Sequence, residues 1–133
     1  MKRRRSAEES PQLTALQVDV MRVLWERGEA TAGDVHAALT AGRRLAPTTV
    51  ATLLRRLEKR GLLAHRTEGR QFVYRPTVGE DEATDAMVSE LAARLFDGDA
   101  ARLVHHLIAR HQIQAGDLER VRALIAAKQR GRR

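Results

Sequence analysis

Apolar residues recur at helical spacing early in the chain, within the segment LTALQVDVMRVLWERGEAT. The residues at this spacing, which we expect to form one buried stripe, are Leu16, Val20, Val23 and Leu24. Thr14 precedes the stripe. Gln17 follows three residues after Thr14, which is the spacing of a capping box. Gly28 favours the left-handed backbone that ends many helices. We therefore predict a helix that begins after Thr14 and ends at Gly28.

A second, shorter helix is predicted within TAGDVHAALTAG. Thr31 is the expected N-cap, because a threonine oxygen can accept a hydrogen bond from a free N–H group of the first turn. Val35, Ala38 and Leu39 are expected to face inward, and Gly42 is expected to end the helix.

The third predicted helix runs from about Pro47 to Arg60 and has two different faces. At 100° per residue its apolar face consists of Val50, Leu53, Leu54 and Leu57. Its opposite face consists of Thr48, Thr52, Arg55, Arg56 and Lys59. Pro47 suits a first helical turn, and Gly61 is the expected stop. One face is thus predicted to pack in a core while the other stays free and basic.

Two short β-type runs follow this helix, LLAHR and QFVYRP, joined by TEGR. Gly69 can supply the positive φ that a tight hairpin turn requires. The order helix, helix, basic helix and hairpin is that of a helix-turn-helix with a wing. We therefore expect a mainly α fold with a small β-hairpin wing.

Helical periodicity returns after residue 80, with one predicted helix ending at Gly98, a second capped by Asp99, and a third over about 116–129. Their apolar stripes are narrow and each needs a facing surface, for which the simplest source is a second copy of the chain. The alternative is that these helices pack back onto the winged domain. The residues expected at a dimer interface are Met87, Leu91, Leu95, Leu118, Val121, Leu124 and Ile125.

These elements predict four parts of the chain. We expect a basic disordered tail over 1–11, a winged-helix DNA-binding domain over 12–78, a helical dimerisation region over 79–129, and a disordered basic tail over 130–133. The chain has no cysteine, which excludes disulfides, thiolate metal sites and cysteine nucleophiles. Because no apolar run approaches a membrane span and the basic start has no apolar stretch behind it, we expect a cytoplasmic protein without membrane insertion.

The formal net charge of +7 is concentrated in one segment of the chain. Residues 40–75 contain nine Lys or Arg and two Asp or Glu, whereas basic and acidic residues balance on either side. A basic patch confined to one segment indicates a polyanionic partner. The alternative is a solvated surface that happens to be rich in arginine.

Double-stranded DNA is the polyanion that this order of elements suits, since its major groove admits one α-helix. Thr48, Thr49 and Thr52 lie in the first turns of the third helix, where base contacts are expected. The candidates for phosphate or guanine contacts are Arg55, Arg56 and Lys59, with Arg70 at the hairpin tip for a phosphate or minor groove. Thr31 begins a helix whose N-terminus can attract an anion. Taken singly, any of these residues could instead be an ordinary surface or capping residue.

Three histidines in the C-terminal region, His105, His106 and His111, raise the question of a metal site. A helical metal pair usually has the spacing i, i+4, and these histidines are one, five and six residues apart. We therefore expect solvated or interface histidines and no metal. The sequence also contains no phosphate-binding loop and no serine triad pattern, so we expect neither a cofactor nor an enzyme.

Three segments together resemble a known family: LTALQVDVMRVLWERGEATAGDVHAAL, APTTVATLLRRLEKRGLL and EGRQFVYRP. They are similar to the penicillinase-repressor family of bacterial transcriptional regulators, the BlaI/MecI/CopY group. The resemblance covers roughly residues 12–125 and weakens after 80. It implies a winged-helix DNA-binding domain, helical dimerisation and repression at a dyad operator. It also places Thr48, Thr49, Thr52 and Arg55 on the recognition helix and Arg70 in the wing.

Two branches of that family are controlled by mechanisms whose sequence motifs this chain lacks or alters. One branch senses copper through a C-terminal cysteine motif, and this chain has no cysteine. Another branch is inactivated by a protease that cuts an Asn-Phe bond and is controlled by a β-lactam-sensing membrane protein. The matching position in this chain is His106-Leu107. A membrane-sensor-controlled protease is thus a candidate partner only by resemblance. The functions that remain open beside a homodimeric repressor are a protein-interaction module and a nonspecific nucleoid-type DNA binder.

Overall fold

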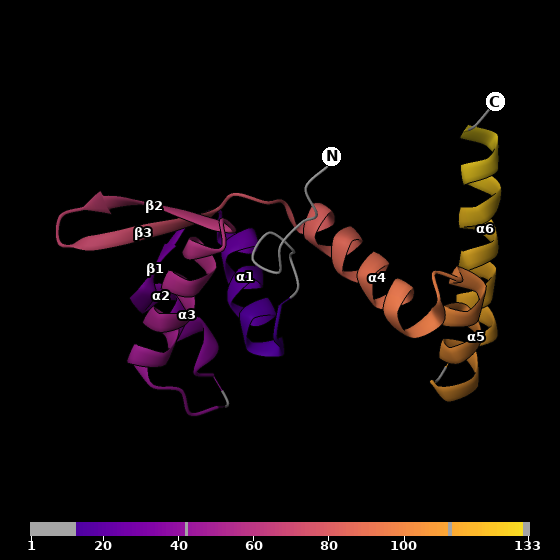
Figure 1. The fold of residues 1–133 in the computed structure, drawn as a ribbon, viewed down its shortest axis with the longest axis horizontal. Helices are drawn as coiled ribbons and strands as arrows, with labels where there is room; N and C mark the ends of the chain where they lie inside the picture. Colours follow the sequence, from indigo (N-terminus) through magenta and orange to yellow (C-terminus); the bar gives the residue numbers. More distant parts are fainter. Residues whose placement is uncertain (1–12, 42, 112, 132–133) are drawn as a thin grey trace, which may run out of the picture. The chain divides into compact units, whose positions relative to one another are not determined.

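The computed structural model describes residues 13–41, 43–111 and 113–131, and the chain divides into two compact units. The first ends at Glu90 and the second begins at Leu91, within a helix that contributes to both. The described elements are α1 (Ala15–Arg27), β1 (Ala30–Thr31), α2 (Ala32–Leu39), α3 (Pro47–Lys59), β2 (Leu63–Glu68), β3 (Gln71–Pro76), α4 (Glu80–Phe96), α5 (Ala100–Arg110) and α6 (Ala115–Gly131). Figure 1 shows them in chain order. The mainly α fold with a β-hairpin wing is confirmed.

Helix α1 begins and ends where local sequence rules place its ends. The Thr14 hydroxyl oxygen accepts a hydrogen bond from the Gln17 N–H at 3.2 Å, and the Gln17 amide oxygen accepts one from the Thr14 N–H at 3.0 Å. Gly28 ends the helix with φ at 84°. The expected stripe differs in one respect, because Met21 is fully buried and Leu16 is only half-buried.

Helix α2 ends earlier than expected. Its last residue is Leu39, and the Thr40 N–H caps it by donating to the His36 carbonyl at 3.0 Å. The Arg43 N–H then donates to the Thr40 carbonyl at 3.2 Å, so a turn begins before the expected stop. Gly42 itself lies outside the described residues.

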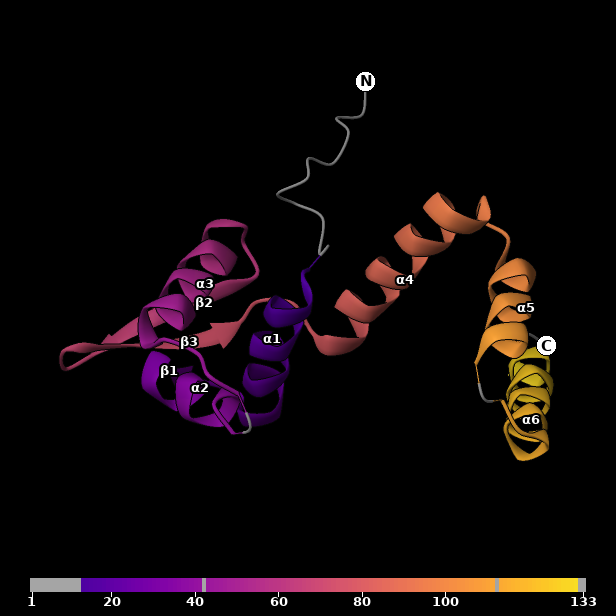
Figure 2. The ribbon, with the colours of Figure 1, turned by 90° about the horizontal axis from the view of Figure 1, so that it is seen from below.

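The sheet has three antiparallel strands in the order β1-β3-β2. Glu68 pairs with Gln71, so Gly69 and Arg70 form a two-residue hairpin loop, and Gly69 has the expected positive φ at 61°. In Figures 1 and 2 this loop projects beyond α2 and α3. Strand β1 was not predicted, because two residues are too short to show a period. It pairs Thr31, the residue before α2, with Val73 of the wing.

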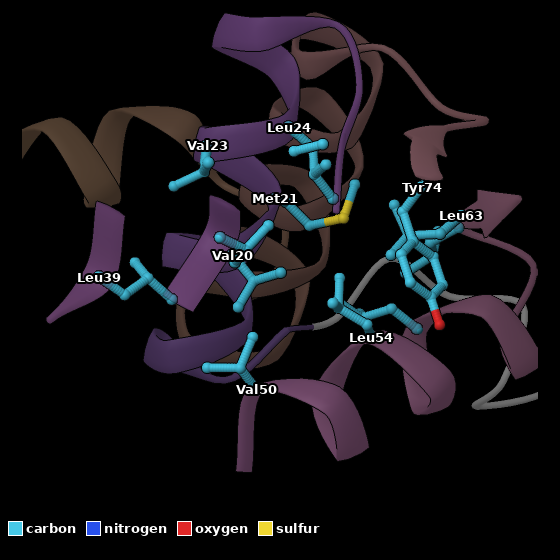
Figure 3. Close-up of a cluster of buried hydrophobic side chains, with 13 residues drawn as sticks. Val20, Met21, Val23, Leu24, Leu39, Val50, Leu54, Leu63 and Tyr74 are labelled. Carbon is cyan, nitrogen blue, oxygen red and sulfur yellow. The ribbon is translucent and has the colours of Figure 1, made fainter. Parts of the chain in front are cut away.

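The core of the first unit joins α1, α2, α3 and the sheet. Figure 3 shows Met21 between Leu24 and Leu54, with Leu63 and Tyr74 approaching from the sheet. The side chains with no exposed surface are Val20, Met21, Leu24, Val35, Val50, Leu54 and Leu57. The inner face of α3 is therefore confirmed at three of its four expected positions. The fourth, Leu53, is half-buried.

The first unit continues past the boundary expected at residue 78. The Trp25 indole N–H donates to the Val78 carbonyl at 2.9 Å, and Ala83 on α4 is 1% exposed. The beginning of α4 thus packs with the winged helix. The pattern favoured a boundary at 78 because helical periodicity restarts there, and a small buried alanine gives no apolar signal.

The second unit consists of the end of α4 with α5 and α6. Asp99 caps α5 as expected, accepting hydrogen bonds from the Ala101 and Arg102 N–H groups at 2.9 and 3.3 Å. Helix α6 reaches Gly131, so the expected tail over 130–133 is wrong at its first two residues, while 132 and 133 lie outside the described residues. Lys128 and Arg130 favour this extension, because cations stabilise the last turn of a helix. No described residue of α5 or α6 is buried, and no described helix is long and apolar enough to cross a membrane.

Candidate nucleic-acid interface

The outward face of α3 is largely exposed. Pro47 occupies the first turn, and the N-cap Ala46 makes no side-chain hydrogen bond. The predicted contact residues Thr48, Thr49, Arg55, Arg56 and Lys59 are exposed, and Thr52 is half-buried. Because Val50, Leu54 and Leu57 anchor the opposite face, this row of polar and basic groups is held in a fixed direction.

An open hollow of about 230 Å³ lies over the first half of α3. It is lined by Thr48, Thr49, Thr52, Leu53 and Arg56. The Thr52 hydroxyl also accepts a long hydrogen bond, 3.4 Å, from the Arg55 guanidinium. The structure thus brings the three predicted base-contacting threonines together with one arginine.

A second open hollow, of about 390 Å³, lies where the start of α2, the middle of α3 and the wing meet. Its lining residues are Thr31, Ala32, Gly33, Ala51, Arg55, Arg70, Gln71, Phe72 and Tyr74. Three predicted contact residues, Thr31, Arg55 and Arg70, are therefore brought together from three elements. Lys59 lines neither hollow and lies in the last turn of α3.

The start of α2 differs from the anion site that was expected there. The Thr31 hydroxyl oxygen accepts a hydrogen bond from the Asp34 N–H, and the Asp34 carboxylate accepts one from the Thr31 N–H, both at 3.1 Å. Hydrogen bonding to the Asp34 carboxyl, first from the Thr31 backbone N–H and then from the Thr31 side chain, lowers the pKa of Asp34, and the charge of Arg27 lowers it further. A carboxylate thus already stands at this helix start, and Thr31 acts as a cap.

The two acidic side chains of the basic segment both have partners. Glu68 accepts a hydrogen bond from the Arg66 guanidinium at 2.7 Å, and Glu58 lies 2.6 Å from the His65 ring. Arg66 also donates to both carboxylate oxygens of Glu29 at 2.8 and 3.1 Å. The carboxylates of Glu29 and then Glu68 raise the pKa of Arg66. Arg66 therefore fastens the wing to the turn after α1.

Phe72 and Tyr74 were not predicted as part of this site. Phe72 is 46% exposed on the wing, whereas Tyr74 is buried. The alternation in QFVYRP could have identified them, since residues two apart on a strand share a face. Both rings lie near His65, with ring centroids 4.0 and 5.7 Å from it.

The histidines of the second unit form no recognisable metal site. His106 lies edge-on to Phe96, with ring centroids 5.6 Å apart, and 6.1 Å from His111. Among the residues that the structure describes, no group of three or more His, Asp or Glu is arranged to hold a metal ion.

Comparison with known proteins links this chain to one family. A family model described as Penicillinase repressor matches residues 13–127. The Transcriptional regulator BlaI of Mycobacterium tuberculosis is 34% identical over 119 residues, which is 87% of this chain and 84% of that protein. The Penicillinase repressor of Bacillus licheniformis is 28% identical over 108 residues, 81% of this chain and 84% of that protein.

Solved structures agree with the winged-helix fold. The solution structure of the DNA binding domain of the repressor BlaI is similar to this chain with a TM-score of 0.50 and 36% sequence identity. The matched region is 55% of this chain and 89% of the chain in that structure. The likeness therefore concerns one domain and not the whole chain.

Proposed function

The chain belongs to the penicillinase repressor family, and we propose that this winged-helix transcriptional repressor binds an inverted-repeat operator as a homodimer. Transcriptional repressors of this family are not enzymes. The observation that carries the proposal is the outward face of α3, which is exposed and basic and meets the wing at a shared hollow.

We assign base contacts to the hollow at the start of α3. A threonine methyl group can pack against a thymine methyl, and its hydroxyl can bind a base edge. Thr48, Thr49 and Thr52 offer three such groups, with Arg56 beside them for a guanine edge or a phosphate.

We assign phosphate contacts to the hollow between α3 and the wing. Arg55 of α3 and Arg70 of the wing both line it, and two arginines at one hollow suit the DNA backbone. Lys59, exposed at the end of α3, is the remaining candidate for a phosphate contact. Thr31 contributes as the cap that shapes the start of α2.

The exposed apolar residues of the second unit support the homodimer. The large apolar side chains exposed there by 37–69% are Leu91, Leu95, Val104, Leu107, Ile108, Ile113, Leu118, Val121, Leu124 and Ile125. So many exposed large apolar side chains in one small unit favour an interaction site. Met87 differs from the other predicted interface residues, because it lies in the first unit and lines a hollow beside Trp25.

The bond matching the family's cleavage site, His106-Leu107, lies within α5. Leu107 is 39% exposed, so its side chain is accessible. Its backbone is helical, and proteases generally bind their substrates in extended form. Control by a membrane-sensor-controlled protease would therefore act on a locally unfolded α5.

Selection of duplexes from a random-sequence pool tests this function against its rivals. A repressor of the proposed kind should enrich an inverted repeat and protect both half-sites from cleavage. A nucleoid-type binder should retain DNA without enriching a sequence. A protein-interaction module should retain no DNA at moderate salt, and either of these results would contradict the proposal.

The two classes of contact on α3 predict different mutational effects. Thr52→Ala should weaken binding to the selected site by about tenfold and hardly change binding to unrelated DNA, because it removes a base contact. Lys59→Ala should weaken both by a similar factor and lower the salt slope by about one unit, because it removes a phosphate contact. Titrations of both duplexes over a salt series measure the two effects. If the ratio of affinity lost for the selected site to affinity lost for unrelated DNA is the same in both variants, the base and phosphate assignments are wrong.

A further inference from the structure

Glu58 is the one acidic residue of α3, the helix to which the proposed function assigns the DNA contacts. It lies one turn after Arg55 and next to Lys59. An unpaired carboxylate at this place would repel DNA phosphates. The structure instead places its Oε2 atom 2.6 Å from Nδ1 of His65 on β2.

His65 is held in place by the wing as well as by Glu58. Its ring stacks on Phe72 with centroids 4.0 Å apart and planes inclined by 17°. It pairs across the hairpin with Tyr74, whose ring centroid is 5.7 Å away. The side chains of His65 and Glu58 are 28% and 32% exposed, so the contact is partly shielded from water. The pair therefore joins α3 directly to the wing.

We propose that His65 is a positioning residue for DNA binding, which holds the carboxylate of Glu58 and masks its charge. The inference rests on the proposed function of the same surface. Without His65, the negative charge of Glu58 is left without this partner on the helix that carries Arg55 and Arg56.

The test compares the wild-type chain with His65→Ala, Glu58→Gln and the double variant, on a duplex recovered by selection from the random pool. His65→Ala should weaken binding by about fivefold. Adding Glu58→Gln should restore the affinity to within about twofold of wild type, because no carboxylate is left to mask. Glu58→Gln alone should bind at least as tightly as wild type.

His65→Phe is the control for a loss of DNA affinity that is caused by misfolding alone. It keeps a ring to stack on Phe72 without the hydrogen bond, and it should lose affinity as His65→Ala does. Rescue by Glu58→Gln is the outcome that a merely structural role of His65 would not produce. The inference is overturned if the double variant keeps the whole loss, or if neither change of His65 weakens binding. A wild-type chain that binds no selected duplex would instead contradict the proposed function itself.

Discussion

Leu54→Ala is expected to lower the free energy of unfolding of the first unit by about 2–5 kcal/mol. Leu54 has no exposed surface, and it lies where α3 meets Met21 of α1 and Tyr74 of the sheet (Figure 3). Truncation removes buried apolar contacts and leaves a cavity among side chains held by three elements. Denaturant unfolding followed by circular dichroism measures the change.

Thr48→Ala is the matched control for this prediction. Thr48 lies on the same helix and is exposed, so its substitution should change the free energy of unfolding by less than about 0.5 kcal/mol. If Leu54→Ala lowers the free energy of unfolding no more than Thr48→Ala does, α3 is not anchored through Leu54. The fixed direction of its outward face would then need another explanation.

Several ends of the elements could be predicted from the sequence because they depend on neighbouring residues, although the ends of α2 and α6 were not. Thr14 and Asp99 cap helices through hydrogen bonds to N–H groups within three residues. Gly28, Gly69 and Gly98 each have a positive φ at the place where the sequence predicts a stop or a turn. These signals are local in the chain, so a single sequence contains them in full.

The contacts that shape the candidate site could not be predicted, because they join residues that are distant in sequence. Strand β1 exists only by pairing with β3, more than forty residues later. The hollow between α3 and the wing needs the start of α2 as a third wall. Charge counting found the basic segment but not that Glu58 and Glu68 are paired within it. The assignment of individual DNA contacts therefore stays a prediction.

The boundary between the two units changes how a monomeric variant should be designed. Truncation at residue 80 would remove Ala83, which is buried against the winged helix. Truncation after Glu90 keeps the whole first unit and removes the exposed stripes of α5 and α6. We expect this shorter chain to remain folded and monomeric. It should bind a single half-site about as well as the full chain does.

The largest functional effect is expected from charges placed in the apolar stripe of α6. The double variant Val121→Glu and Ile125→Glu places two like charges one turn apart, on residues that are 45% and 53% exposed in the single chain. Burying them at a twofold interface would bring four carboxylates together, so the dimer should dissociate. Operator binding should fall by about a hundredfold or more, since linking two reading heads raises affinity by about 10² to 10⁴.

Ala123→Glu is the control, because it adds the same side chain to the opposite, exposed side of α6 and should leave the dimer intact. Sedimentation at micromolar concentration gives the oligomeric state, and titration of operator and half-operator gives the binding loss. The double variant should lose affinity for the operator and keep its affinity for the half-operator, because α3 and the wing are untouched. If the wild-type chain itself sediments as a monomer at this concentration, the apolar stripe is not a dimer interface. The operator then has no need of twofold symmetry.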